Sequence, residues 1–280
     1  MHGPYKNLLT LTIVLCKLLV PVSDSAVAEK SKFWPAGKVG AVSLTFDDGM
    51  PSQLEQAIPL LRKYGLKGTF YVNPNYSLNW TQSVRLWQQV VLEGHEIGNH
   101  TDSHPCSCRH HFRNNRNFCL ERMTLTDIAT SIDSGSSALR KLFRGSLVDR
   151  TFAYPCNESF VGMGTTRKSY VPEVARRYVA GRGEYSLIGN DPLEADLSFL
   201  YSHGVEGMKS VQISELIEHE ILSGRWVILT FHGIGKEWLP IKLVEFERML
   251  NYLRKNRSRI WIAPVAVIAN YILSQRRRKG

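Results

Sequence analysis

The sequence has no apolar run long enough to cross a lipid bilayer comfortably. Its first apolar segment, Leu8 to Val20, is interrupted by Lys17 and is shorter than the roughly 20 residues that a membrane-spanning helix needs. The segment precedes Ala26-Val27-Ala28, the small-residue pattern that a signal peptidase cleaves. We therefore expect residues 1–28 to be a signal peptide and residues 29–280 to be exported, periplasmic or extracellular, without a stable membrane span.

Acidic residues are scarce relative to basic ones. The chain has 25 Asp and Glu against 35 Lys and Arg, which gives a formal net charge of +10. A surplus of this size favours anionic surroundings such as cell-wall polymers or lipid headgroups, although it serves solubility equally well. Much of it lies in 109–116 and in the C-terminal run 276–279. No nucleic-acid-binding motif accompanies these runs, so we do not expect a nucleic-acid partner.

Cysteine is also sparse, with five residues in 280. Cys16 belongs to the predicted signal peptide, and four cysteines remain after its removal: Cys106, Cys108, Cys119 and Cys156. An even number in an exported chain indicates disulfides, with three possible connectivities. A zinc site that uses Cys106 and Cys108 is the alternative, although a C-x-C pair alone is weak support for it.

The rest of the chain alternates between strand and helix patterns. We predict strands at 39–46, 68–72, 96–98, 151–154, 226–231 and 260–262, and helices at 54–64, 80–92, 124–142, 171–177, 213–222, 243–255 and 264–273. Residues 106–121 have the composition of a loop, and 181–207 give little periodic signal. Alternation of this kind predicts βαβ units and a mainly parallel sheet, with polar residues gathered at the carboxyl ends of the strands, as in a barrel. No internal repeat or linker is visible, so we expect a single catalytic domain.

The first chemically informative segment is Thr45-Phe46-Asp47-Asp48-Gly49, at the end of an apolar strand. Adjacent carboxylates point in different directions from an extended chain, so they do not easily share one role. One can bind a metal ion while its neighbour takes up a proton. An ordinary Asp-Gly turn explains the segment about equally well when it is considered alone.

Two further segments contain histidine. His100 and His104 are four residues apart, and on one helical turn they would bind a single metal ion, although a surface pair is also possible. Gly98 and Asn99 before the pair, with a proline after it, indicate a shaped turn. His232 follows a buried strand and, taken alone, is more often a core residue. Taken together, one Asp and two His form a three-ligand set that leaves a fourth position open, as in catalytic zinc sites.

The order of these motifs resembles that of the NodB-homology polysaccharide deacetylases, carbohydrate esterase family 4. The motifs are Thr-Phe-Asp-Asp-Gly, His-x-x-x-His, Tyr-Pro and Leu-x-x-His, and the resemblance extends from Ala41 to Tyr271. The resemblance implies a distorted (β/α) barrel with fewer than eight regular repeats. It also implies an enzyme that removes N- or O-linked acetyl groups from an acetylated polysaccharide with a divalent metal, Zn²⁺ being the simplest choice. The implied metal ligands are Asp48, His100 and His104, the implied base is Asp47, the implied acid is His232, and the implied oxyanion donor is the backbone N–H of Tyr154.

Two departures from the family pattern concern the partners of the catalytic residues. The family often has an arginine just before its Pro-Tyr motif, and this chain has none there; Arg150 and Arg182 are possible replacements. The family's Asp-Trp motif is also absent, and Asp191 and Asp196 are candidates without a matching Trp. A catalytically inactive carbohydrate-binding protein and a metal-dependent amidase that acts on small molecules are the competing functions.

The resemblance also bears on the cysteines, because Cys106 lies two residues beyond His104 and Cys156 two residues beyond Tyr154. If both motifs face one metal, a Cys106–Cys156 bridge follows, and Cys108 and Cys119 are left to close the basic loop. A Cys108–Cys156 pairing and four free thiols remain open as alternatives.

Overall fold

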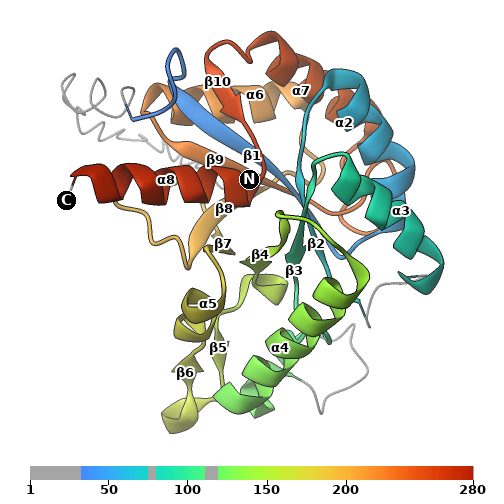
Figure 1. The fold of residues 1–280 in the computed structure, drawn as a ribbon, viewed down its shortest axis with the longest axis vertical. Coiled ribbons are helices and arrows are strands. Elements are labelled where there is room, and N and C mark those ends of the chain that lie inside the picture. The colour runs from blue at the N-terminus through green and yellow to red at the C-terminus, as the bar shows by residue number, and fades with distance from the viewer. Residues whose placement is uncertain (1–32, 75–79, 111–118, 280) are drawn as a thin grey trace, which may run out of the picture.

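The centre of the computed structural model is a parallel sheet that closes on itself (Figure 1). The model describes residues 33–74, 80–110 and 119–279, so the predicted signal peptide lies outside the described residues and stays a prediction. Seven strands form the closed barrel, because β1 pairs with both β2 and β9. They are β1 (Gly40–Asp47), β2 (Thr69–Val72), β3 (Glu96–Asn99), β4 (Val148–Ala153), β7 (Ala180–Tyr185), β8 (Leu200–Gly204) and β9 (Trp226–Phe231). The predicted distorted barrel is confirmed.

Helices cover the outside of this barrel, and short elements fill the connections. The helices are α2 (Ile58–Tyr64, preceded by the π-helical turn η1, Gln53–Ala57), α3 (Trp80–Leu92), α4 (Leu125–Leu142), α5 (Val171–Arg177), α6 (Ser210–Leu222), α7 (Leu243–Lys255) and α8 (Val265–Lys279). The short elements are η3 (Leu120–Arg122), η4 (Pro155–Asn157), η5 (Gly164–Thr166), the hairpin β5–β6 (Phe160–Val161 and Lys168–Ser169) and β10 (Ile260–Ile262), which pairs with β1. Within the described residues, no helix is both long enough and apolar enough to cross a membrane.

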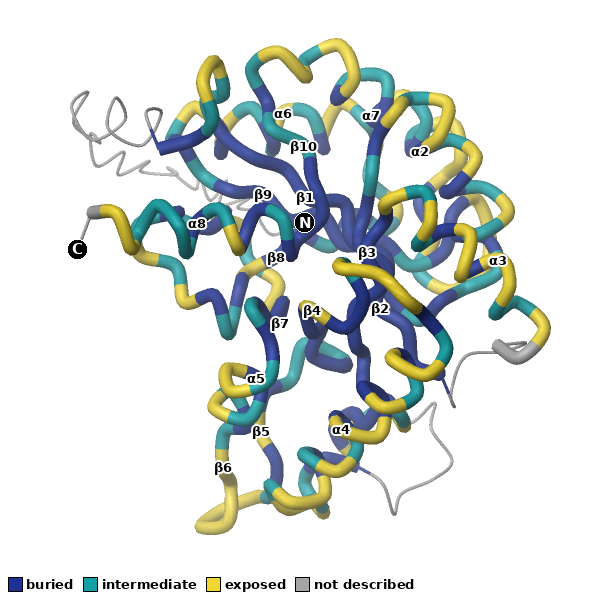
Figure 2. Tube along the Cα trace, viewed as in Figure 1, coloured by how far each residue is buried: buried dark blue, intermediate teal, exposed yellow. Residues whose placement is uncertain are grey.

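The alternation of side chains along β1 explains how the barrel and its helices share this strand. Leu44 and Phe46 pack in the cluster under the outer helices, and the Phe46 ring stacks 4.6 Å from that of Phe70 on β2. Ser43 and Thr45, which alternate with them, make hydrogen bonds inside the barrel instead. Because successive side chains of a strand point to opposite faces, Asp47 continues the inward row of Ser43 and Thr45. Figure 2 shows the resulting buried centre and the exposed outer turns of the helices.

A buried carboxylate joins the barrel to α8. Glu96, at the start of β3, accepts hydrogen bonds from Thr69 and Thr151 on the neighbouring strands, and a third from the backbone N–H of Ala266 in the first turn of α8. Burial raises the pKa of the Glu96 carboxyl, although the bond from the Ala266 N–H opposes this. An acid at a helix N-terminus is favourable, so Glu96 fixes where α8 begins.

Most predicted elements are present, and α3, α5, β9 and α7 have the predicted bounds. Strands β7 and β8 were not predicted; they lie at 180–185 and 200–204, almost entirely within the region 181–207 that has little periodic signal. Both are short strands that combine glycine with charged or polar residues, in the sequences AGRGEY and LYSHG. Their place in the sheet comes from pairing with neighbouring strands rather than from an apolar pattern.

Two disulfides confirm the predicted connectivity. Cys106 pairs with Cys156, with Cα atoms 5.6 Å apart, and Cys108 pairs with Cys119, with Cα atoms 4.9 Å apart. The first bridge joins the segment after β3 to the turn after β4. The alternatives, a Cys108–Cys156 pairing or free thiols, are not what the structure contains.

We expect Glu96→Ala to lower the free energy of unfolding by about 3 kcal/mol, because it leaves two threonine hydroxyls and a helix N–H without their acceptor in a buried site. Urea denaturation measures this change. Glu215→Ala, an exposed position on α6, is the matched control and should change stability by at most about 0.5 kcal/mol. Equal effects of the two variants would show that Glu96 does not anchor α8.

Candidate active site

The three predicted metal ligands, Asp48, His100 and His104, converge at the carboxyl ends of β1 and β3. Asp48 Oδ1 lies 3.2 Å from His104 Nε2 and 3.7 Å from His100 Nε2. One ligand atom from each residue lies within 4.8 Å of the others, a spacing at which all three could hold one metal ion. The site is well enclosed, since both histidines are buried and the Asp48 side chain is only 20% exposed.

The backbone of both ligand segments contains residues in a conformation that residues other than glycine rarely adopt. Asp48, Thr101 and His104 have φ angles of 73°, 61° and 49°, in the left-handed region. The histidine pair therefore lies on an irregular turn after β3, as Asn99 and Pro105 suggested, and not on a helical turn. Strained residues of this kind persist where surrounding contacts fix them, and they cluster at functional sites.

The ring of His100 is oriented by its second nitrogen. Its Nδ1 lies 2.8 Å from the carbonyl oxygen of Ala153 on β4, so the Nδ1–H tautomer leaves the Nε2 lone pair directed at Asp48. Metal-binding histidines are commonly oriented in this way. Burial, with a further contribution from His104, lowers the pKa of His100 to about 4, so the ring is neutral and able to bind a metal at neutral pH. Burial opposes ionisation of Asp48, but the nearby imidazoles, above all His104, outweigh it and lower its pKa.

Asn99 holds the histidine turn in place, a role that the sequence indicated only as a shaped turn. Its side-chain oxygen accepts from the Thr101 N–H at 2.7 Å, and its nitrogen donates to Ser136 of α4 and to Tyr178. Gly135 permits this contact with α4, because a Cβ there would lie 2.9 Å from the Asn99 oxygen and 3.1 Å from the Thr101 carbonyl carbon. Helix α4 and the histidine turn are thus packed so closely that a Cβ atom at position 135 would not fit.

Asp47 points into the barrel and forms an ion pair with Arg182 of β7. Arg182 Nη2 donates to Asp47 Oδ2 at 2.5 Å, and both side chains are almost completely buried. Burial opposes the charge of Arg182, but the Asp47 carboxylate outweighs it and raises the pKa of the guanidinium. Of the two arginines suggested by the sequence, Arg182 therefore contacts the predicted base, whereas Arg150 is exposed on β4.

His232 completes the group, with its Nε2 3.9 Å from Asp47 Oδ2 and 13% of its side chain exposed.

Gln53, which the sequence analysis did not single out, links the ends of β1 and β9. Its side-chain nitrogen donates to the backbone oxygens of Asp47 and His232, at 2.6 and 3.2 Å. A glutamine in the first turn after Asp-Asp-Gly has no distinctive sequence signal.

The expected role of the Tyr154 N–H does not match the structure. This N–H donates to the carbonyl oxygen of Arg182 at 2.9 Å, as part of the pairing between β4 and β7. It is therefore engaged within the sheet and is not directed toward a substrate oxyanion. The Tyr154 side chain is buried, and its hydroxyl donates to the backbone of Ser198.

Asp191 and Asp196 do not partner His232. Their carboxylates accept from the backbone N–H groups of Leu193 and Ser198, two residues further along in each case. The segment between them accepts hydrogen bonds from Arg276 of α8, the helix whose first turn donates to Glu96. Both acids therefore stabilise local turns away from the histidines.

Comparisons with known proteins agree with this fold. Residues 36–159 match the family model described as polysaccharide deacetylase. A chitin deacetylase of Arthroderma benhamiae is 33% identical over 97 residues, which is 35% of this chain and 25% of that protein. A peptidoglycan-N-acetylglucosamine deacetylase of Bacillus cereus is 41% identical over 64 residues, 22% of this chain and 29% of that protein. The matched segments thus span less than a third of either relative.

Solved structures show the same fold. A family 4 acetyl xylan esterase from Clostridium thermocellum, solved with a cobalt ion, superposes with a TM-score of 0.52 and 19% identity, covering 82% of this chain and 90% of that one. The barrel therefore has the fold of the carbohydrate esterase family 4 structures. Residues 36–159 belong to the polysaccharide deacetylase family that their match identifies.

The contact between Asp47 and Arg182 can be tested by a double-mutant cycle. Arg182→Met leaves a carboxylate buried without its cation, so we expect it to cost about 3–5 kcal/mol of stability. Asp47→Asn in the same protein should recover a large share of that loss, which gives a coupling of roughly 1–3 kcal/mol. Arg150→Met, at the one exposed position of β4, is the control and should be nearly neutral. Strict additivity of the two single changes would refute the pairing.

Proposed function

We propose that this protein is a metal-dependent hydrolase that removes acetyl groups from a polysaccharide. The observation that carries the proposal is the convergence of Asp48, His100 and His104 beside the ion-paired Asp47. Family membership supports the reaction class. The names of the relatives, which act on chitin and on peptidoglycan N-acetylglucosamine, favour an N-acetylated amino-sugar polymer as the substrate.

The three donors fit a divalent metal. Ligands about 2.0–2.1 Å from a tetrahedral zinc ion lie roughly 3.3 Å apart, and the two separations from Asp48 to His104 and His100, 3.2 and 3.7 Å, lie on either side of that value. One carboxylate and two imidazoles suit zinc and also accept other divalent ions. When bound, such an ion would polarise the acetyl carbonyl and make a water molecule more acidic.

Asp47 is proposed as the general base. Its Oδ2 is held by Arg182, while its Oδ1 is buried and has no hydrogen-bond partner among the described residues. That second oxygen therefore retains the capacity to accept a proton. Because Arg182 holds the Asp47 carboxylate and His104 lies beside the Asp48 carboxylate, base and metal ligand keep separate positions although they are neighbours in sequence.

His232 is proposed as the general acid, which gives a proton to the departing amine or hydroxyl of the sugar. Its ring lies at the same strand ends as Asp47 and is partly open to solvent, as a group that meets substrate must be. The engaged N–H of Tyr154 has no part in this scheme. A metal ion held by Asp48, His100 and His104 would stabilise the negative charge on the acetyl oxygen.

Export through the predicted signal peptide 1–28 remains part of the proposal. Two disulfides within one small chain suit an oxidising compartment. The positive net charge suits a cell-wall or other anionic environment.

His104→Ala should lose bound metal and deacetylase activity together, because it removes one of three ligands from a buried site. Elemental analysis gives the metal content, and acetate release from an N-acetylglucosamine oligomer gives the activity. His219→Ala, whose side chain is 79% exposed on α6, should keep both. Full metal occupancy in His104→Ala would overturn the ligand assignment.

Asp47→Asn and His232→Ala should each keep the metal and lose about 10²–10⁴-fold in rate, the usual contribution of general acid–base catalysis. Asp133→Asn, a surface position on α4, controls for loss of one carboxylate charge. If either catalytic variant also loses metal, that residue is a ligand and its proposed role is wrong.

A further inference from the structure

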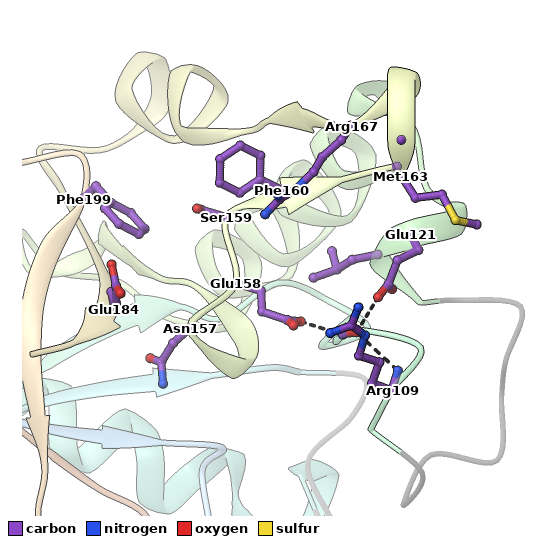
Figure 3. Close-up of a pocket in the computed structure, with 14 residues that line it drawn as sticks. Arg109, Glu121, Asn157, Glu158, Ser159, Phe160, Met163, Arg167, Glu184 and Phe199 are labelled. Carbon is purple, nitrogen blue, oxygen red and sulfur yellow. Dashed lines mark hydrogen bonds between the residues drawn. The ribbon is translucent and has the colours of Figure 1, made fainter.

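A cleft of ≈ 630 Å³ lies beside the proposed active site (Figure 3). Its volume is within the roughly 300–1,000 Å³ typical of small-molecule sites. Three parts of the chain form its walls: the loop that follows Cys106, the hairpin β5–β6, and the region of β7 and β8 that carries Glu184 and Phe199. None of the proposed metal ligands or catalytic residues lines it.

The Cys106–Cys156 disulfide forms the boundary between this cleft and the metal-ligand turn. Ser107 and Asn157, the residues that follow the two cysteines, both line the cleft. On the other side, Cys106 Sγ lies 3.5 Å from His104 Nδ1. One end of the cleft is therefore only one residue away from a disulfide that touches a proposed ligand.

Asn157 links the cleft to the proposed base as well. Its side-chain oxygen accepts from Arg182 Nη1 at 3.3 Å, and the other terminal nitrogen of Arg182 holds Asp47. This end of the cleft is therefore close to the proposed base. One polymer chain could place one sugar at the proposed active site and another sugar in the cleft.

The loop wall is held rigidly by two carboxylates. Glu158 accepts from the Ser107 N–H at 2.5 Å, and Glu121 accepts from the Ser107 hydroxyl and from the Cys108 N–H at 2.7 Å. These acids are occupied by the protein itself. A wall fixed in advance costs a ligand less ordering on binding.

The opposite wall presents an aromatic ring and a guanidinium together. The Phe160 ring is 42% exposed, and the guanidinium carbon of Arg167 lies 4.1 Å from the ring centre. Figure 3 shows both side chains on the hairpin, with Arg109 on the facing wall. Neither arginine forms an ion pair with another described residue. An aromatic face offers apolar contact to a sugar ring, and a planar guanidinium recognises a carboxylate through two parallel hydrogen bonds.

We propose that this cleft binds a second sugar of the same polymer and selects a sugar that carries a carboxylate. Arg167, oriented by Phe160, is the main specificity-determining residue. Arg109 is a second cation in the cleft, and it lies close enough to Glu121 and Glu158 to offset part of their negative charge. The position relative to the deacetylated sugar rests on the proposed function, whereas the preference for an acidic sugar rests on the cleft alone.

Two tetrasaccharides test this preference: one that alternates N-acetylglucosamine with glucuronic acid, and the neutral N-acetylglucosamine tetramer. Binding is measured by calorimetry on the His232→Ala protein, so that turnover does not interfere. We expect the acidic ligand to bind about 10-fold more tightly, the scale of one charge-assisted hydrogen bond at a partly exposed site. Higher salt should reduce the difference.

Arg167→Gln should abolish this preference and leave the affinity for the neutral tetramer within about twofold, because the lost interaction is with the carboxylate. Arg254→Gln, an exposed arginine at the end of α7, is the matched control and should change neither affinity. Arg109→Gln provides a second variant if thermal unfolding shows that Arg167→Gln is not folded, and it should reduce the preference in part.

Equal affinity of the wild-type cleft for both ligands, or an equal loss for both in Arg167→Gln, would overturn the inference. Acetate release from the tetramer is measured in parallel with the wild-type chain. Acetate release without an acidic preference contradicts only the cleft, whereas an acidic preference without acetate release contradicts only the proposed function.

Discussion

The ion pair between Asp47 and Arg182 inside the barrel is the interaction on which the site depends. It joins β1 to β7 through two side chains that are 0% and 5% exposed, and an unpaired charge at such a buried position would cost several kcal/mol. The pair fixes one carboxylate of Asp47-Asp48-Gly49 toward the barrel axis. Because the next residue adopts a positive φ, the second carboxylate turns toward the histidines. Two neighbouring acids thereby acquire two different environments.

The histidine turn has a comparable set of constraints on the other side of the site. Asn99 holds its backbone, the close contact at Gly135 sets its distance from α4, and the Ala153 carbonyl orients one imidazole. The Cys106–Cys156 bridge then joins its far end to the turn after β4. Three left-handed residues can remain at the site because contacts on several sides determine their positions. The same bridge places the adjacent cleft next to the proposed ligands.

The sequence predicted those features that depend on local pattern. Strand β9 is a nearly continuous apolar run and helix α7 has strong apolar periodicity, and both have the predicted bounds. The cysteine pairing could be inferred because Cys106 and Cys156 each lie two residues beyond a motif residue, which left Cys108 and Cys119 as the second pair. Strands β7 and β8 could not be predicted, because glycine and charged residues replace the apolar alternation that marks other strands.

The choice of Arg182 and the state of the Tyr154 N–H depend on contacts that no local pattern contains. Arg182 meets its partner across 135 residues of sequence, and its own backbone carbonyl occupies the Tyr154 N–H. Both follow from the pairing of β4 with a strand that the sequence did not reveal. The motifs therefore indicated which residues lie together at the strand ends, but they did not indicate the hydrogen bonds that those residues make.

The most direct test of the central claim is acetate release from an N-acetylglucosamine oligomer by the purified chain before chelation, after chelation, and after zinc is restored. Metal content is measured at each stage. We predict that activity disappears with the metal and returns with it in proportion to occupancy. Undiminished acetate release from protein shown to be free of metal would contradict the account.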